Sequence, residues 1–161
     1  MNKAIFLDRD GVINHPKKNY YVYRKEDFII NRGVIEALQY LQEKDYLLFV
    51  ITNQGGISKG KYSQSDVEAV HTHMEEEFIR HGIDLSGIYY CPHHPKHERC
   101  LCRKPEPLML QKAMAQFDVD AERSWFIGDK KTDVEAGRRA GVNTLKVRRN
   151  QDLRKVLKKI V

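Results

Sequence analysis

The sequence has few cysteines, one tryptophan and no long uninterrupted hydrophobic stretch. Three cysteines among 161 residues, an odd number, argue against a framework of disulfides. No apolar run approaches the roughly 18 residues that a membrane-spanning helix needs, so we expect no membrane segment. An apolar strand begins almost at the first residue and leaves no room for a signal peptide. We therefore expect a cytoplasmic protein.

The length and the hydrophobic pattern predict a single α/β domain over residues 1–161, because a chain of this size can bury one core. Strands are expected at residues 3–8, 46–51, 88–90, 125–127 and 144–147. Helices are expected at residues 34–44, 63–81, 107–117, 131–140 and 152–160. Short apolar strands separated by helices indicate a parallel sheet between two helical layers, as in a three-layer, Rossmann-like domain. Residues 14–32 and 91–105 are the least regular parts.

Two carboxylates follow the first strand, at Asp8 and Asp10, and Gly11 comes next. Residues two apart on a strand point the same way, so both carboxylates can converge beyond the strand's end. Carboxylates held that close repel each other unless a cation lies between them. The pattern predicts a Mg²⁺ site with one carboxylate free to act as a nucleophile. The alternative is an ordinary turn, in which aspartate accepts local hydrogen bonds and glycine takes a positive φ.

Polar groups also follow the other predicted strands, and these ends meet at one edge of a parallel sheet. They are Thr52, Asn53 and Gln54, then the Arg103-Lys104 pair before Pro105, then Gly128-Asp129-Lys130 with Asp133. Carboxylates, a hydroxyl and an ammonium suit phosphoryl transfer. A metal neutralises charge, the hydroxyl and backbone amides bind phosphoryl oxygens, and lysine balances the charge of the transition state.

Taken in order, these residues resemble the four motifs of the haloacid dehalogenase superfamily over essentially the whole chain. The matching segments are Asp8-x-Asp10-Gly11, Thr52-Asn53, Lys104 and Gly128-Asp129-x-x-x-Asp133. The resemblance implies that Asp8 is the nucleophile, which forms an aspartyl-phosphate. It implies that Asp10 protonates the leaving alkoxide and then activates water, while Thr52 and Lys104 hold the phosphoryl group.

The same resemblance implies a magnesium site. Mg²⁺ would be held by the carboxylate of Asp8, the backbone carbonyl of Asp10 and the carboxylate of Asp129, with Asp133 behind them. One departure is Val12, where many relatives have threonine. Valine removes a hydroxyl but no group that the chemistry needs, so we still expect activity.

The three cysteines fall within one short window together with three histidines. They are Cys91, Cys100 and Cys102, with His93, His94 and His97. Three thiolates and one imidazole make a closed, tetrahedral zinc site of the structural kind. The spacing leaves the choice of histidine open. The alternative is a flexible loop with free thiols.

Cys91-Pro92-His93, followed by Cys100-Leu101-Cys102 running into Arg103-Lys104, resembles a narrower branch of the superfamily. Its members are phosphatases with little or no cap domain that act on histidinol phosphate or on heptose 1,7-bisphosphate. The resemblance implies a capless core and a zinc-bound loop in which His93 is the fourth ligand. It also implies that zinc stiffens the loop that delivers Arg103 and Lys104 to the site.

Local sequence favours the heptose substrate, because residues 52–62 and 88–95 resemble the heptose bisphosphatases. We expect cleavage of D-glycero-D-manno-heptose 1,7-bisphosphate at position 7, with histidinol phosphate as the alternative, because the short zinc loop resembles that of the histidinol enzymes. The predicted substrate-binding residues are Asn53, Gln54, Arg103 and Lys130. A second phosphate needs extra cations, for which Lys59 and Lys61 are also available. Histidinol would need an acid for its ammonium, for which Glu98 and Glu106 are candidates.

The net charge of +6 is concentrated near the C-terminus: residues 138–161 contain nine basic residues and one acid, so residues 1–137 carry about −2. A basic segment can bind nucleic acid, and a zinc-stabilised nucleic-acid-binding module is the alternative of another class. No aromatic residues are interleaved to stack on bases, so we favour a solvated helix face. Its exposed residues would be Arg154, Lys155, Lys158 and Lys159. We expect a monomer that acts on a small phosphorylated sugar or amino alcohol.

Overall fold

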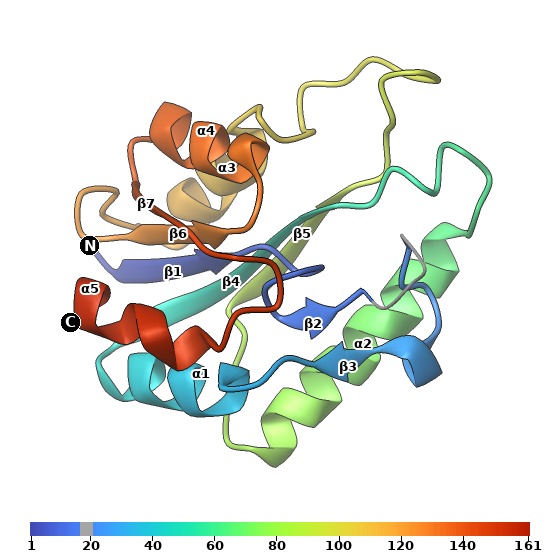
Figure 1. Ribbon diagram of the computed structural model, residues 1–161. Helices are drawn as coiled ribbons and strands as arrows, with labels where there is room; N and C mark the ends of the chain where they lie inside the picture. The colour runs from blue at the N-terminus through green and yellow to red at the C-terminus, as the bar shows by residue number, and fades with distance from the viewer. Residues whose placement is uncertain (17–20) are drawn as a thin grey trace.

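A five-stranded parallel sheet forms the centre of the protein, in a computed structural model that describes residues 1–16 and 21–161. The strand order is β5-β4-β1-β6-β7. The strands are β1 (Lys3–Leu7), β4 (Tyr46–Asn53), β5 (Gly87–Cys91), β6 (Trp125–Gly128) and β7 (Asn143–Lys146). All four pairings between neighbours are parallel, as the sequence predicts. Both termini lie at the left in Figure 1, and the arrows of these five strands point away from them.

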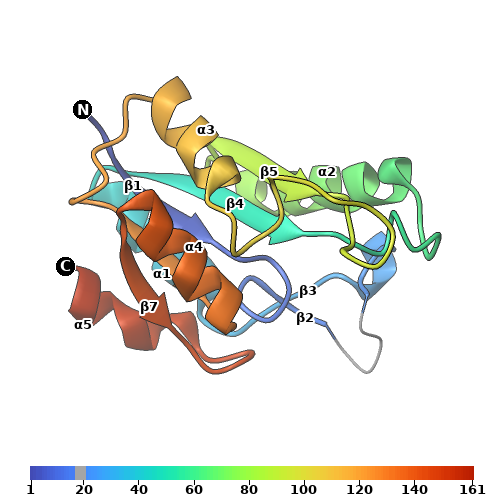
Figure 2. The same cartoon turned by 90° about the horizontal axis from the view of Figure 1, so that it is seen from above.

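Helices cover both faces of the sheet, which confirms the three-layer prediction (Figures 1 and 2). One face carries α3 (Leu108–Gln116) and α4 (Lys131–Ala140). The other carries α1 (Val34–Glu43), α2 (Gln64–Arg80) and the C-terminal segment, which comprises the 3₁₀ turn η2 (Leu153–Val156) and the short helix α5 (Leu157–Ile160). No helix in the described part of the chain combines the length and apolar character that a bilayer span requires.

The central strand β1 is buried on both faces, because successive side chains point to opposite sides of the sheet. Ile5 and Leu7 belong to the hydrophobic core beneath α1 and α2, whereas Ala4 and Phe6 belong to the core beneath α3 and α4. All four side chains are fully buried. This double burial accounts for the continuous apolar run that predicted the strand.

The ends of the helices follow local signals in the sequence. Ser63 caps α2: its hydroxyl accepts from the backbone N–H of Asp66, and the Asp66 carboxylate accepts from the backbone N–H of Ser63. This reciprocal pair is a capping box. Helix α4 ends at Gly141, which has a φ of 83°, a conformation that glycine adopts without steric cost.

One prediction about local structure gains detail and another needs correction. The irregular stretch 14–32 contains a small antiparallel pair, β2 (Asn14–His15) with β3 (Ile29–Ile30), while residues 17–20 of that stretch lie outside the described residues. The terminal helix expected over 152–160 begins instead as the 3₁₀ turn η2, whose start is capped by Asp152, which accepts from the backbone N–H of Arg154. The four basic residues predicted to be exposed there are exposed.

Candidate active site

The candidate site lies at the carboxyl end of β1, the middle strand of the sheet. The strands β4 and β6 flank β1, so Asp8 lies between residues that end both neighbours. Asp8 and Thr52 are buried, and Asp129 is partly buried at the end of β6. The structure therefore brings together the groups that the sequence placed at strand ends.

Lys104 is the buried cation of this site. Its Nζ donates to Asp8 Oδ1 at 2.9 Å and to the backbone carbonyl of Ile51 at 2.8 Å. Asp133 Oδ1 lies 2.7 Å from Nζ as an ion pair. The ammonium thus has two hydrogen-bond acceptors and a second carboxylate beside it. Burial alone would lower the pKa of Lys104, but the charges of Asp8 and Asp133 outweigh it and raise the pKa above its ordinary value.

The carboxylates around Lys104 can accommodate a divalent cation. Oxygen atoms of Asp8, Asp129 and Asp133 all lie within 4.8 Å of one another. Asp129 Oδ1 is buried and has no hydrogen-bond partner among the described residues. Burial raises the pKa of Asp8 to about 7, although the charge of Lys104 acts in the opposite direction. A cation at these oxygens would satisfy Asp129 and favour the ionised form of Asp8, so the donor set fits Mg²⁺.

Asp133 contacts protein groups through both carboxylate oxygens. Oδ1 pairs with Lys104, and Oδ2 accepts from the backbone N–H of Lys130 at the start of α4. A Cβ on Gly128 would lie 2.5 Å from Asp133 Cγ, so only glycine leaves room for this packing. Both oxygens therefore face protein groups, and the place of Asp133 behind the metal ligands stays a prediction.

Asp10 is held by a network of donors. Its carboxylate accepts from Arg9, from Asn14 Nδ2 at 3.0 Å and from Gln54 Nε2 at 3.0 Å. Burial would raise the pKa of Asp10, but the charge of Arg9 and these hydrogen bonds outweigh it and lower the pKa. The side chain is thus fixed in orientation and ionised in the free protein.

Arg9 itself is fully buried, a feature that the sequence analysis missed. Its guanidinium donates to Asp10 and to the backbone carbonyl of Val22, and Nη1 lies 3.1 Å from His71 Nε2. Arginine has no acceptor, so His71 must be neutral and accept through Nε2. Burial, and then the charge of Arg9, lower the pKa of His71 to about 3, with Asp10 opposing them.

Thr52 and the two residues after it line the site from β4. Thr52 Oγ1 accepts from Gln54 Nε2 at 3.0 Å, and Gln54 Oε1 accepts from the hydroxyl of Tyr62 at 2.7 Å. Asn53 pairs with the main chain of Lys104, donating to its carbonyl and accepting from its N–H. Asn53 therefore positions the segment that carries Lys104, in addition to lining the cleft.

A cleft of about 450 Å³ opens over these residues. Among the described residues, four cationic side chains line it: Arg103, Lys104, Lys130 and Arg149. Below it, a pit of about 20 Å³ is lined by Asp8, Thr52 and Lys104, with Asp10, Asn53, Lys130, Thr132 and Asp133. The site thus consists of a small polar pit that contains the carboxylates and the wider, positively charged cleft outside it.

The Cys/His cluster predicted for zinc is assembled in the structure. Cys91 Sγ lies 3.0 Å from Cys102 Sγ and 3.6 Å from Cys100 Sγ, and His93 Nδ1 lies 3.3 Å from Cys102 Sγ. Four soft donors at these separations can surround one ion, and they fit a closed tetrahedral zinc site. His94 instead lines the cleft, so the geometry favours His93 among the three histidines.

The surroundings of the cluster connect it to the cleft. The other ring nitrogen of His93, Nε2, lies 3.5 Å from Glu98 Oε2, which is the arrangement that orients metal-binding histidines. The backbone carbonyl of His93 accepts from Arg103 Nη1 at 3.0 Å. The loop that carries the cysteines therefore holds in position Arg103, one of the cationic residues that line the cleft.

Comparison with known proteins decides the family. A family model described as HAD-hydrolase-like matches residues 101–160. The D-glycero-alpha-D-manno-heptose-1,7-bisphosphate 7-phosphatase of Campylobacter jejuni is 48% identical over 143 residues, covering 89% of this chain and 80% of that protein. The chain belongs to this family of haloacid dehalogenase-like phosphatases. The prediction of a phosphatase is confirmed, and the nucleic-acid-binding alternative finds no support in these relatives.

Other members of the family agree. A D-glycero-beta-D-manno-heptose-1,7-bisphosphate 7-phosphatase of Helicobacter pylori is 43% identical, covering 88% of this chain and 80% of that protein. The solved structure of D,D-heptose 1,7-bisphosphate phosphatase from B. bronchiseptica, complexed with magnesium and phosphate, superposes with a TM-score of 0.84. That structure is 31% identical, and the match covers 98% of this chain and 86% of that one.

Proposed function

We propose that residues 1–161 form one phosphatase domain that hydrolyses D-glycero-D-manno-heptose 1,7-bisphosphate at position 7. The observation that supports this substrate is the charge of the cleft. Arg103, Lys104, Lys130 and Arg149 line it, and Asp10 is the one carboxylate among its described lining residues. A second phosphate suits such a chamber, whereas an ammonium group does not.

The histidinol alternative would need an acid facing the substrate, and neither candidate is in the cleft. Glu98 lies beside His93, and Glu106 pairs with Arg139 at 3.1 Å. Neither glutamate is among the residues that line the cleft. Among the described residues, the amino alcohol would thus meet four cations and no carboxylate except Asp10, which is already hydrogen-bonded, and this disfavours it as the substrate.

The residues of the pit would carry out the chemistry in two steps. In the first, an Asp8 oxygen attacks phosphorus, the bond to the sugar oxygen breaks, and the leaving alkoxide takes a proton from Asp10, which becomes protonated when the anionic phosphate binds beside it. In the second, Asp10 takes a proton from water, which attacks the aspartyl-phosphate and releases inorganic phosphate. The lowered pKa of Asp10 suits the second step. Thr52 and Lys104 hold the phosphoryl oxygens throughout.

Two metals would support these residues. Mg²⁺, held by Asp8, Asp129 and the backbone carbonyl of Asp10, neutralises negative charge on the phosphoryl group when bound. Zinc, held by three cysteines and His93, has a structural role. It stiffens the loop that leads into Arg103 and Lys104. Among the predicted substrate-binding residues, Gln54 orients Asp10, whereas Arg103 and Lys130 contact the substrate.

A comparison of phosphate release tests the proposal. The heptose bisphosphate and histidinol phosphate are assayed in parallel, with and without Mg²⁺. We expect Mg²⁺-dependent turnover with a clear preference for the bisphosphate. Asp8→Asn should abolish turnover and leave the melting temperature similar or higher, while the same exchange at exposed Asp84 should change neither. A preference for histidinol phosphate would refute the substrate, and appreciable activity of Asp8→Asn would refute the nucleophile.

A further inference from the structure

The loop after β7 lies on the cleft, although the sequence analysis assigned its basic residues no role in a site. It comprises residues 148–151, between β7 and η2. Arg149 lines the cleft together with Arg103 and Lys130, but it is not among the residues that line the pit around Asp8. Arg149 is therefore placed to contact a part of the substrate other than the reacting phosphoryl group.

The backbone of this loop is tied to the turn that follows the candidate nucleophile. Asn150 donates its backbone N–H to the carbonyl of Gly11 at 2.7 Å, and its side-chain oxygen accepts from Asn31 Nδ2 at 3.1 Å. Asn150 has a φ of 60°, a left-handed conformation that asparagine tolerates better than most residues. These contacts fix the backbone beside Arg149.

The side chain of Arg149 packs its aliphatic part against the same turn. A Cβ on Gly11 would lie 3.2 Å from Arg149 Cγ and 2.5 Å from Asp129 Oδ2. Glycine at position 11 thus leaves the space that Arg149 and Asp129 share. The stem of Arg149 is supported, so less side-chain entropy is lost when its guanidinium binds a ligand.

The guanidinium of Arg149 forms no ion pair with the described residues, unlike those of Arg139 and Arg154. Arg139 contacts Glu106 and Glu135, and Arg154 contacts Asp152 at 2.6 Å. A supported arginine without an acidic partner, on the wall of a cleft, is available for an anionic ligand. Its planar fork of N–H donors matches two oxygens of a phosphate.

We propose that Arg149 binds the second phosphate of a sugar bisphosphate and so determines the preference for a bisphosphate over the corresponding monophosphate. This inference rests on the proposed function and adds a specificity residue to it. Binding of a remote group that is equally strong in the ground and transition states lowers KM and leaves kcat unchanged. Loss of Arg149 should therefore appear mainly in KM for the bisphosphate.

Two heptose phosphates that differ only at the anomeric carbon provide the test: the 1,7-bisphosphate and the 7-monophosphate. We expect Arg149→Ala to lower kcat/KM for the bisphosphate about tenfold or more, the usual effect of losing a charge-assisted hydrogen bond. For the monophosphate we expect a change of no more than about twofold. Arg149→Lys, which keeps the charge but loses the fork, should show an intermediate preference.

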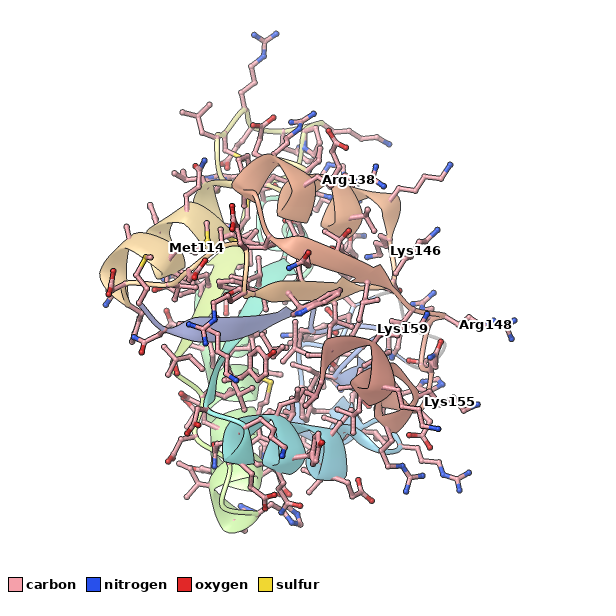
Figure 3. The ribbon with its side chains drawn as sticks, turned by 90° about the vertical axis from the view of Figure 1, so that its left-hand side faces the viewer. Met114, Arg138, Lys146, Arg148, Lys155 and Lys159 are labelled. Atoms are coloured by element: carbon pink, nitrogen blue, oxygen red, sulfur yellow. The ribbon has the colours of Figure 1, made fainter. Side chains whose placement is uncertain are left out.

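Arg148→Ala is the matched control. Figure 3 shows Arg148 at the margin of the molecule, with its side chain extending away from the sheet, and it is exposed. This variant removes one positive charge from the adjacent position and should leave both substrates unaffected. Equal losses on both substrates in Arg149→Ala, or an equal loss in Arg148→Ala, would overturn the inference.

The wild-type arm separates the two proposals. If the wild-type protein hydrolyses neither heptose phosphate, the proposed function fails and the inference fails with it. If the wild type prefers the bisphosphate and Arg149→Ala keeps that preference, only the inference fails. Melting temperatures of all three variants, which change exposed side chains, should match the wild type.

Discussion

His71 should make the stability of this protein depend on pH, because it is buried against an arginine that is always charged. The ring accepts from Arg9 through Nε2, and its pKa in the folded protein is lowered to about 3. In the unfolded chain a histidine titrates near pH 6.5. Below that pH the unfolded chain binds a proton that the folded protein does not bind. The contribution of His71 is thus fully present above about pH 6.5 and is lost as the pH falls toward 3.

The size of the effect at a convenient pH follows from these values. A pH of 5 is about 1.5 units below the pKa of histidine in the unfolded chain. In the folded protein at this pH the ring of His71 is still neutral. At 1.36 kcal/mol per unit, folding becomes about 2 kcal/mol less favourable than at pH 8. This loss of stability depends little on the pKa of His71 in the folded protein, provided that this pKa stays well below 5.

Urea unfolding at pH 8 and pH 5 would measure this loss in the wild type and in His71→Gln. Glutamine can accept from Arg9 through its side-chain carbonyl but does not titrate. Between the two pH values the variant should therefore lose about 2 kcal/mol less stability than the wild type. His73→Gln, two residues along α2 and facing Phe28, retains His71 and should lose as much as the wild type. If His71→Gln and the wild type lose equal stability between the two pH values, the assignment of a neutral, buried His71 is wrong.

Three further changes test the site and the core. Asp129→Asn should raise the Mg²⁺ concentration needed for half-maximal activity at least about tenfold, because a buried ligand oxygen loses its charge; an unchanged Mg²⁺ titration would contradict the ligand assignment. Cys100→Ser should reduce the zinc bound per chain, measured by elemental analysis, and lower the melting temperature; full zinc content would exclude the proposed tetrad. Phe78→Ala should cost about 3–5 kcal/mol in denaturant unfolding, because Phe78 is fully buried. The neighbouring Ile79→Ala should change stability by no more than about 0.5 kcal/mol, since Ile79 is 63% exposed, and similar losses in both would refute the packing.

Most of the fold could be predicted from the sequence because its elements carry strong local signals. The strand at 46–51 is a continuous apolar run, and Ser63 with Asp66 marks the start of α2. The β2–β3 pair could not be predicted, because strands of two residues show no periodicity. The C-terminal turn was misassigned for a related reason, since helical spacing does not separate a 3₁₀ turn from a short α-helix.

The carboxylates, Thr52 and Lys104 could be located from the sequence because each follows an apolar strand or a recognisable motif. The buried residues that hold these groups in place could not be located from the sequence. Arg9 was treated as a spacer between two aspartates, yet it is fully buried and joins Asp10 to His71. Contacts between residues 62 positions apart leave no local pattern.

Arg149 was missed for a different reason. It stands in a basic segment, and composition alone does not distinguish a solvated cation from one that faces a cleft. Its position two residues after the strand predicted at 144–147 was the available signal, because the carboxyl ends of parallel strands meet at one edge.

The order of strands in the sheet has a practical consequence for studies of refolding. The pit needs residues from the turn after β1, from β4, from the segment before α3 and from the start of α4, and its outermost members, Asp8 and Asp133, are 125 positions apart in the chain. No partly folded fragment that lacks one of these segments can contain it. Recovery of turnover after dilution from denaturant would therefore report when the last of these segments reaches its native position. The circular dichroism of the helices would report the formation of secondary structure before that point.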